Sequence, residues 1–202
     1  MEMTRKEFLE LAGRASAAAA ALGAWDLLSP AAAHAKDVLD SPEVRKIHDR
    51  IAALKADHIR KVQADLRQPS VSPWKMGIQE MADRMIGHFK AIGCKEANLV
   101  KTDGLPGVWA WYDVGAPKTI SVYMMYDTQP WDEKRWSNPP LEARLVPLAP
   151  FEQVVMARGA INDKGPNRMF LNALETILEV HGKLPVNIMF TCDGEEEQGS
   201  PN

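Results

Sequence analysis

Residues 186–200 read Val-Asn-Ile-Met-Phe-Thr-Cys-Asp-Gly-Glu-Glu-Glu-Gln-Gly-Ser. The first seven form a nearly continuous apolar run, which predicts a strand buried on both faces. An acidic turn follows, with four carboxylates between Asp193 and Glu197. Carboxylates gathered at the end of a buried strand are costly unless a cation, a metal or water compensates them. The alternative is a solvated acidic turn without a chemical role.

The segments before this strand predict an α/β fold. A helical apolar stripe runs from Pro166 to about His181 and leads directly into the strand. Short β-branched or aromatic runs are separated by Gly, Pro and Asp, which is typical of further strands. Strand, helix and strand in this order favour a sheet with parallel members. The other predicted strands cover residues 97–101, 108–112, 119–126 and 154–158.

Two earlier helices are predicted nearer the amino terminus. Ser41-Pro42 has the residue types of a helix start, and apolar positions then recur at helical spacing up to Pro69. A second stripe runs from Ile78 to Ile92, with Gly93 where a C-terminal cap is expected. Residues 127–150 contain five prolines and no regular period, which indicates an ordered loop.

Composition excludes several classes of function. The 202 residues carry a formal net charge of −3 and have a sequence pI near 6.0, so nothing favours binding to nucleic acid or to an anionic membrane. Cys94 and Cys192 form no Cys-x-x-Cys pair, which leaves redox and zinc-finger chemistry unsupported.

The first 35 residues resemble an export signal. They combine a basic start at Arg5-Lys6, an alanine-rich middle and an Ala-x-Ala end at Ala33–Ala35. Lys6 stands where a twin-arginine signal has its second arginine. The apolar run is too short to span a bilayer. We expect cleavage after Ala35 and a periplasmic or secreted protein; if these residues instead form an amphipathic helix of the folded domain, the protein is cytoplasmic.

Two further motifs follow predicted strands, as the acidic turn does. They are Tyr126-Asp127-Thr128-Gln129-Pro130 and Arg158-Gly159-Ala160-Ile161-Asn162-Asp163-Lys164-Gly165. Open α/β sheets place their ligands at strand ends, so the three segments are expected to meet. The second motif lacks the Gly-Lys-Ser/Thr ending of a phosphate loop. A carboxylate near a metal-bound water is the usual arrangement for general-base hydrolysis.

Together, the three motifs resemble metallopeptidase family 20, which includes carboxypeptidase G, carnosinase, acetylornithine deacetylase and succinyl-diaminopimelate desuccinylase. The resemblance spans most of residues 41–202. It implies a zinc-peptidase-like three-layer α/β domain with a mixed, largely parallel sheet. Residues 36–202 would be its N-terminal part, incomplete at the C-terminus and without the lid domain, so that this polypeptide alone is expected to be inactive.

The same resemblance assigns roles to individual residues. Glu196 matches the general base, Glu197 the metal ligand after it, and Asp127 the acid that orients a ligand histidine two places earlier. Met125 stands in place of that histidine, and Asn162 in place of the aspartate that bridges two metals. Thioether and neutral amide are poor zinc ligands, so a normal two-zinc centre is not expected.

Two functions follow from these roles. The first is a metal-dependent hydrolase, using zinc or another divalent ion, that cleaves amide bonds of small peptides or N-acyl amino acids with Glu196 as base. The second is a non-catalytic relative that binds a peptide-like ligand in the same cleft. Asp163 is a possible substitute for the missing bridging carboxylate. The family also implies a possible homodimer of the full-length protein.

Overall fold

The computed structural model describes residue 39 and residues 41–202. Residues Arg50–Asn202 form one compact unit. The predicted export signal of residues 1–35 lies outside the described residues. None of the helices in the described ranges is both long and apolar enough to cross a bilayer.

The long helix predicted to end before Pro69 is two helices. They are α3, Pro42–Ala53, and α4, Lys55–Arg67, and they are interrupted at Leu54. The predicted start is confirmed, since the hydroxyl of Ser41 accepts a hydrogen bond of 3.3 Å from the amide of Val44. The other helices are α5, Ile78–Ala91, and α6, Lys164–His181. Short 3-10 turns lie at η1, Ser72–Trp74, η2, Glu133–Arg135, and η3, Glu196–Gln198.

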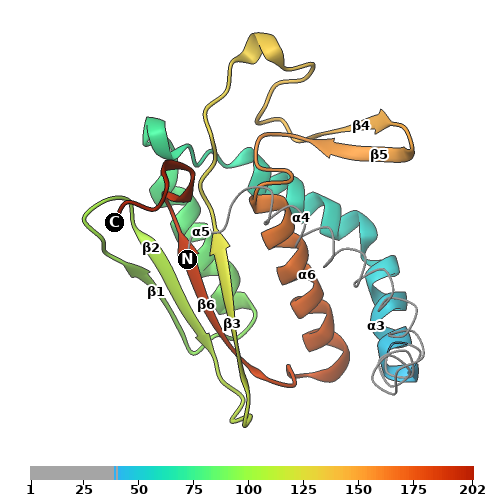
Figure 1. The fold of residues 1–202 in the computed structure, drawn as a ribbon. Helices are drawn as coiled ribbons and strands as arrows, with labels where there is room; N and C mark the ends of the chain where they lie inside the picture. Colours follow the sequence, from blue (N-terminus) through green and yellow to red (C-terminus); the bar gives the residue numbers. More distant parts are fainter. Residues whose placement is uncertain (1–38, 40) are drawn as a thin grey trace, which may run out of the picture. The chain divides into compact units, whose positions relative to one another are not determined.

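The main sheet has the order β1-β2-β6-β3 (Figure 1). The strands are β1, Glu96–Val100, β2, Gly107–Tyr112, β3, Thr119–Met125, and β6, Asn187–Asp193. The mixed α/β sheet is confirmed, but the expectation that it is largely parallel is wrong for the described strands. Only β3 and β6 pair in parallel, whereas β1–β2 and β2–β6 are antiparallel.

The physical reason is the length of the connections. Residues 101–106 and 113–118 are too short for a parallel crossover, so β1, β2 and β3 alternate in direction. The β3–β6 connection contains α6 and is long enough for a parallel return. Strand β6 enters between β2 and β3, so it is parallel to one neighbour and antiparallel to the other.

A separate hairpin corrects the prediction for residues 127–158. Residues 144–148 of the expected loop form β4, Arg144–Leu148, which pairs with β5, Phe151–Met156. The strand predicted at 154–158 is therefore this β5, and it belongs to the hairpin rather than to the main sheet.

The core lies between α5, α6 and one face of the sheet. Helix α5 packs on β1 and β2, and the rings of Phe89 and Phe190 lie 4.6 Å apart between α5 and β6. On β6, Ile188, Phe190 and Cys192 are buried on this face, while Met189 and Thr191 on the other face are half-buried. The predicted burial of this strand is therefore complete on the helix-covered face and partial on the face of Met189 and Thr191.

Asp65 ties α4 to α5 by a buried charge network. Its carboxylate is 2% exposed, accepts hydrogen bonds from Arg84 and His88, and interacts electrostatically with buried Lys164. Burial alone would raise the pKa of Asp65, but the hydrogen bonds from His88 and Arg84 outweigh burial and hold it below its ordinary value.

Replacing Asp65 with Asn is expected to lower the free energy of unfolding at pH 7 by about 2–3 kcal/mol, because Arg84 and Lys164 lose their buried countercharge. The lowered pKa means that this stabilisation is present above the unfolded-state pKa and is lost as the pH falls through the folded-state value. Urea unfolding at pH 7 and at successively lower pH measures both effects. Asp83→Asn, at an exposed position of α5, should change stability by no more than about 0.5 kcal/mol. Equal losses in the two variants would contradict the prediction.

Candidate functional site

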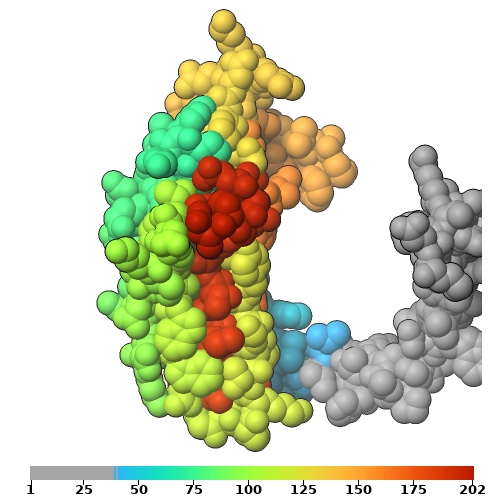
Figure 2. Space-filling view, turned by 60° about the vertical axis from the view of Figure 1, so that its left-hand side comes forward, coloured from blue at the N-terminus to red at the C-terminus, as the bar shows by residue number. Residues whose placement is uncertain are grey.

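The three predicted motifs meet at the carboxyl ends of β3 and β6. Met125 and Asp193, the last residues of these strands, are paired in the parallel register. The amide of Tyr126 then donates to the carbonyl of Asp193 over 2.9 Å, so the two chains leave the sheet side by side. Figure 2 shows the red carboxyl end of the chain at the surface, bordered by green residues of the β1–β2 connection and by yellow residues that follow β3.

Asp127 is the buried anchor of the site. It is fully buried, and its Oδ2 accepts hydrogen bonds from the Ser72 hydroxyl, at 2.5 Å, and from the Glu197 amide, at 3.0 Å. Burial raises the pKa of Asp127 despite these two bonds. Its Oδ1 has no hydrogen-bond partner among the described residues. Asp127 therefore fixes the backbone of the acidic turn through Oδ2, while its Oδ1 makes no hydrogen bond with the described residues.

Glu197 is held by side-chain amides. Its Oε1 accepts a hydrogen bond of 2.9 Å from Asn162, and its Oε2 accepts one of 2.8 Å from Gln129. Gln129 also donates to the Glu197 carbonyl over 2.9 Å. Asn162 and Glu197, both assigned to the metal site by the family resemblance, are in direct contact. The sequence predicts no role for Gln129, although its motif contains the residue.

Glu196 differs from its neighbours because its carboxylate is free. The residue opens η3 and is half-buried, and in the described part of the chain no hydrogen bond or ion pair reaches its side chain. A carboxylate in this state can accept a proton from a water or a ligand. This is the property expected of a general base.

The remaining acids of the turn have structural roles. Glu195 is 4% exposed and accepts a hydrogen bond of 3.1 Å from the amide of Leu105, which joins η3 to the β1–β2 connection. Asp193 accepts bonds from the Glu195 amide and the Ser200 hydroxyl, at 2.8 and 2.6 Å. Gly194 must lack a side chain, since a Cβ there would lie 2.3 Å from the Tyr126 hydroxyl. The four carboxylates of the sequence pattern therefore separate into two that brace the turn and two that face the site.

The loop before α6 is held by the basic side chains of buried Lys164 and half-buried Arg158. Lys164 donates to the carbonyl of Gln68 over 2.6 Å, and burial lowers the pKa of Lys164 to about 8. Arg158 donates to the carbonyl of Pro130 over 3.0 Å and lies over the ring of Trp136, 5.2 Å from its centroid. These bonds tie the 158–165 motif to α4 and to the segment after β3.

The donor set does not fit a pair of metal ions. Met125 is buried at the end of β3 and offers only a thioether, and the Asn162 amide nitrogen points at Glu197 as a donor. Asp163 lies close enough to Glu197 that burial and that charge both raise its pKa. Within the described ranges, no three His, Cys, Asp or Glu side chains are grouped as metal ligands. Of the two residues that the sequence predicts as metal ligands, Asn162 and Glu197, only Glu197 carries a carboxylate.

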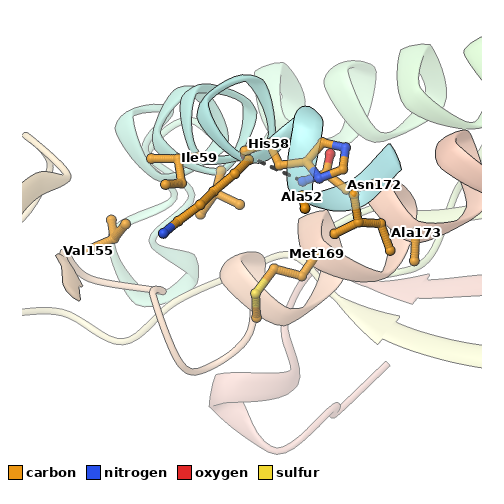
Figure 3. A pocket seen from close by; sticks show the side chains of 10 residues that line it. Ala52, His58, Ile59, Val155, Met169, Asn172 and Ala173 are labelled. Atoms are coloured by element: carbon orange, nitrogen blue, oxygen red, sulfur yellow. Dashed lines mark hydrogen bonds between the residues drawn. The ribbon is translucent and has the colours of Figure 1, made fainter. Parts of the chain in front are cut away.

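An apolar cavity lies away from the acidic turn. A cavity of about 420 Å³ is lined by the end of α3, by α4, by α6 and by Val155 of β5, and Figure 3 shows His58, Ile59 and Met169 around it. Asn172 closes one side by donating to the His58 carbonyl over 3.3 Å. Asp127, Glu196 and Glu197 do not line this cavity.

Comparisons with known proteins agree with this geometry. Residues 123–202 match the family described as peptidase family M20/M25/M40. Two curated relatives are Cys-Gly metallodipeptidases. That of Candida albicans is 26% identical over 174 residues, covering 78% of this chain and 35% of the relative. That of Schizosaccharomyces pombe is 28% identical over 169 residues, covering 77% and 35%.

Solved structures give the same result. The M20 family metallo-carboxypeptidase Sso-CP2 of Sulfolobus solfataricus matches with a TM-score of 0.62 and 33% identity, over 72% of this chain and 32% of that one. Human carnosine dipeptidase 1 matches in fold with a TM-score of 0.69 and 22% identity, over 80% and 36%. This chain spans about a third of the length of these proteins. The family match covers the end of β3, all of β6 and the loops that build the site, and it supports a chain similar to one part of the peptidases of family M20/M25/M40.

Proposed function

We propose that the full-length protein hydrolyses amide bonds of small peptides or N-acyl amino acids, with Glu196 as general base. The observation that carries this proposal is the contrast within one turn, where Glu195 and Glu197 are fully bonded and Glu196 is free. A turn that served only structure would gain from bonding all three carboxylates. The printed names of the relatives, metallodipeptidases and a metallo-carboxypeptidase, support the same class of reaction.

Each residue would contribute differently to this reaction. Glu196 would take a proton from the attacking water and return it to the leaving amine. Asp127 would act as a positioning residue, because it accepts the Glu197 amide and so fixes the turn that carries Glu196. Ser72 would hold Asp127 in turn.

We propose one divalent ion, with zinc as the first candidate, bound through Glu197 and further ligands outside the described residues. The family is one of metallopeptidases, but the residues at positions 125 and 162 do not suit a second ion. When bound, such an ion would polarise the amide carbonyl.

The test is hydrolysis by the full-length protein of Cys-Gly, other dipeptides and N-acyl amino acids, before and after treatment with a chelator. We expect turnover that the chelator abolishes and added Zn²⁺ or Mn²⁺ restores. Binding of these compounds without turnover under any metal condition would instead establish a non-catalytic binding protein.

We further propose that the protein is exported, since residues 1–35 have the parts of an export signal. Amino-terminal sequencing of the protein from a cell fraction outside the cytoplasm should begin at Lys36. A cytoplasmic protein that retains Met1 would contradict this proposal.

A further inference from the structure

Every polar group of Glu197 already has a partner within the chain. The amide donates to Asp127, the carbonyl accepts from Gln129, and the two carboxylate oxygens accept from Gln129 and Asn162. The two donors to the carboxylate stabilise its charged form. Glu197 is thus satisfied as it stands, although it is the charged ligand left for a metal.

The donors are anchored to different elements. Gln129 follows Thr128, whose amide donates to the Ser70 carbonyl over 2.8 Å and whose side chain is buried. Asn162 lies in the loop before α6, which Lys164 fastens to Gln68. The two side-chain amides therefore approach Glu197 from two separately fixed loops.

An amide donor and a metal ion compete for the same oxygen lone pairs. A side-chain N–H that points at a carboxylate oxygen occupies one of its two lone-pair directions and leaves less negative charge for a cation. The substitution at position 162 contributes directly to this competition. A carboxylate there would repel Glu197 without an ion, whereas the Asn162 amide attracts it.

We propose that Gln129 and Asn162 form an amide latch that closes on Glu197 and lowers the affinity of the site for divalent cations. The latch rests on the proposed function for the identity of Glu197 as a ligand. In this proposal, an ion that binds Glu197 competes with the hydrogen bonds from Gln129 and Asn162. Gln129 is in this sense a residue that sets metal affinity without being a ligand.

The experiment is a Zn²⁺ titration of the chelator-treated full-length protein by isothermal calorimetry. Gln129→Ala removes one donor to the Glu197 carboxylate and should tighten Zn²⁺ binding by about three- to tenfold, since the bond is solvent-exposed and of modest strength. Gln129→Glu removes the donor at nearly constant shape and adds a carboxylate that can itself bind Zn²⁺, so it should tighten binding further, while Gln129→Ala isolates the loss of the donor.

The matched controls use Gln79, which also donates to a carboxylate, that of Asp83, over 2.9 Å on the exposed face of α5. Gln79→Ala and Gln79→Glu should leave Zn²⁺ affinity unchanged. Circular dichroism and the Tm of each variant establish that it is folded. If a folded Gln129→Ala variant binds Zn²⁺ no more tightly than the Gln79 variants, the latch is wrong.

The outcome is independent of the hydrolysis assay. Turnover by the wild type together with unchanged affinity in the Gln129 variants would reject the latch and leave the proposed function. Tighter Zn²⁺ binding in those variants without turnover in any protein would support the latch and reject the hydrolase.

Discussion

Replacing Glu196 with Gln in the full-length protein is expected to lower kcat/KM for dipeptide hydrolysis by about 100- to 10,000-fold, the range that general-base catalysis supplies. The amide keeps the shape of the side chain but cannot accept the proton of the attacking water. Because the Glu196 carboxylate has no partner to lose in the described part of the chain, the free energy of unfolding should change by less than about 0.5 kcal/mol. Steady-state kinetics and urea unfolding measure the two quantities.

Glu152→Gln, an exposed position on β5, is the control and should keep full activity. The neighbouring Glu195→Gln provides a contrast, because Glu195 is buried and bonded to Leu105. It should lower stability as well as activity. A Glu196→Gln variant within a few-fold of the wild type would show that another group is the base.

The fold was predictable where local patterns decide it. The strand before Asp193 is predictable because its apolar residues are nearly continuous, and α6 is predictable because its apolar residues recur at helical spacing. The direction of β2 and the separate β4–β5 hairpin were missed, because pairing depends on which strands meet in space. In that hairpin Val146 pairs with Val154 and Leu145 pairs with Val155, and no sequence period reveals this pairing.

The site was predictable in its acids but less so in their division of labour. Asp127, Glu196 and Glu197 come together as expected, because parallel β3 and β6 end at the same edge of the sheet. A run of three glutamates does not say which member is buried, and the contact of Glu195 with Leu105 decides that. Ser72 was not identified either, since it lies far along the chain from Asp127, its hydrogen-bond partner.

In the part of the chain that the structure describes, one oxygen of Asp127 lacks the hydrogen-bond donor that a different residue at position 125 could supply. Its Oδ1 is buried without a partner among the described residues, an unusual and costly condition for a carboxylate. The side chain two residues earlier, Met125, is buried and cannot donate a hydrogen bond. An imidazole at that position could donate to Oδ1 with one nitrogen and bind a metal with the other. Met125 therefore offers neither the metal ligand nor the hydrogen-bond donor that the family resemblance implies at this position.

Restoring both altered positions should rebuild a two-metal centre. We expect Met125→His combined with Asn162→Asp to bind two Zn²⁺ ions per chain in the full-length protein, where the wild type binds at most one. The first site should also tighten by at least about 100-fold, because an amide donor to Glu197 becomes an anionic ligand and an imidazole replaces a thioether. Calorimetric stoichiometry and metal analysis after dialysis measure the result. Asn162→Asp alone should raise affinity without adding a second ion, since Asp127 would still lack a histidine to orient. A double variant that binds no more metal than the wild type would mean that the remaining ligands of a binuclear centre are absent from the protein, and that its chemistry has moved away from two-metal hydrolysis altogether.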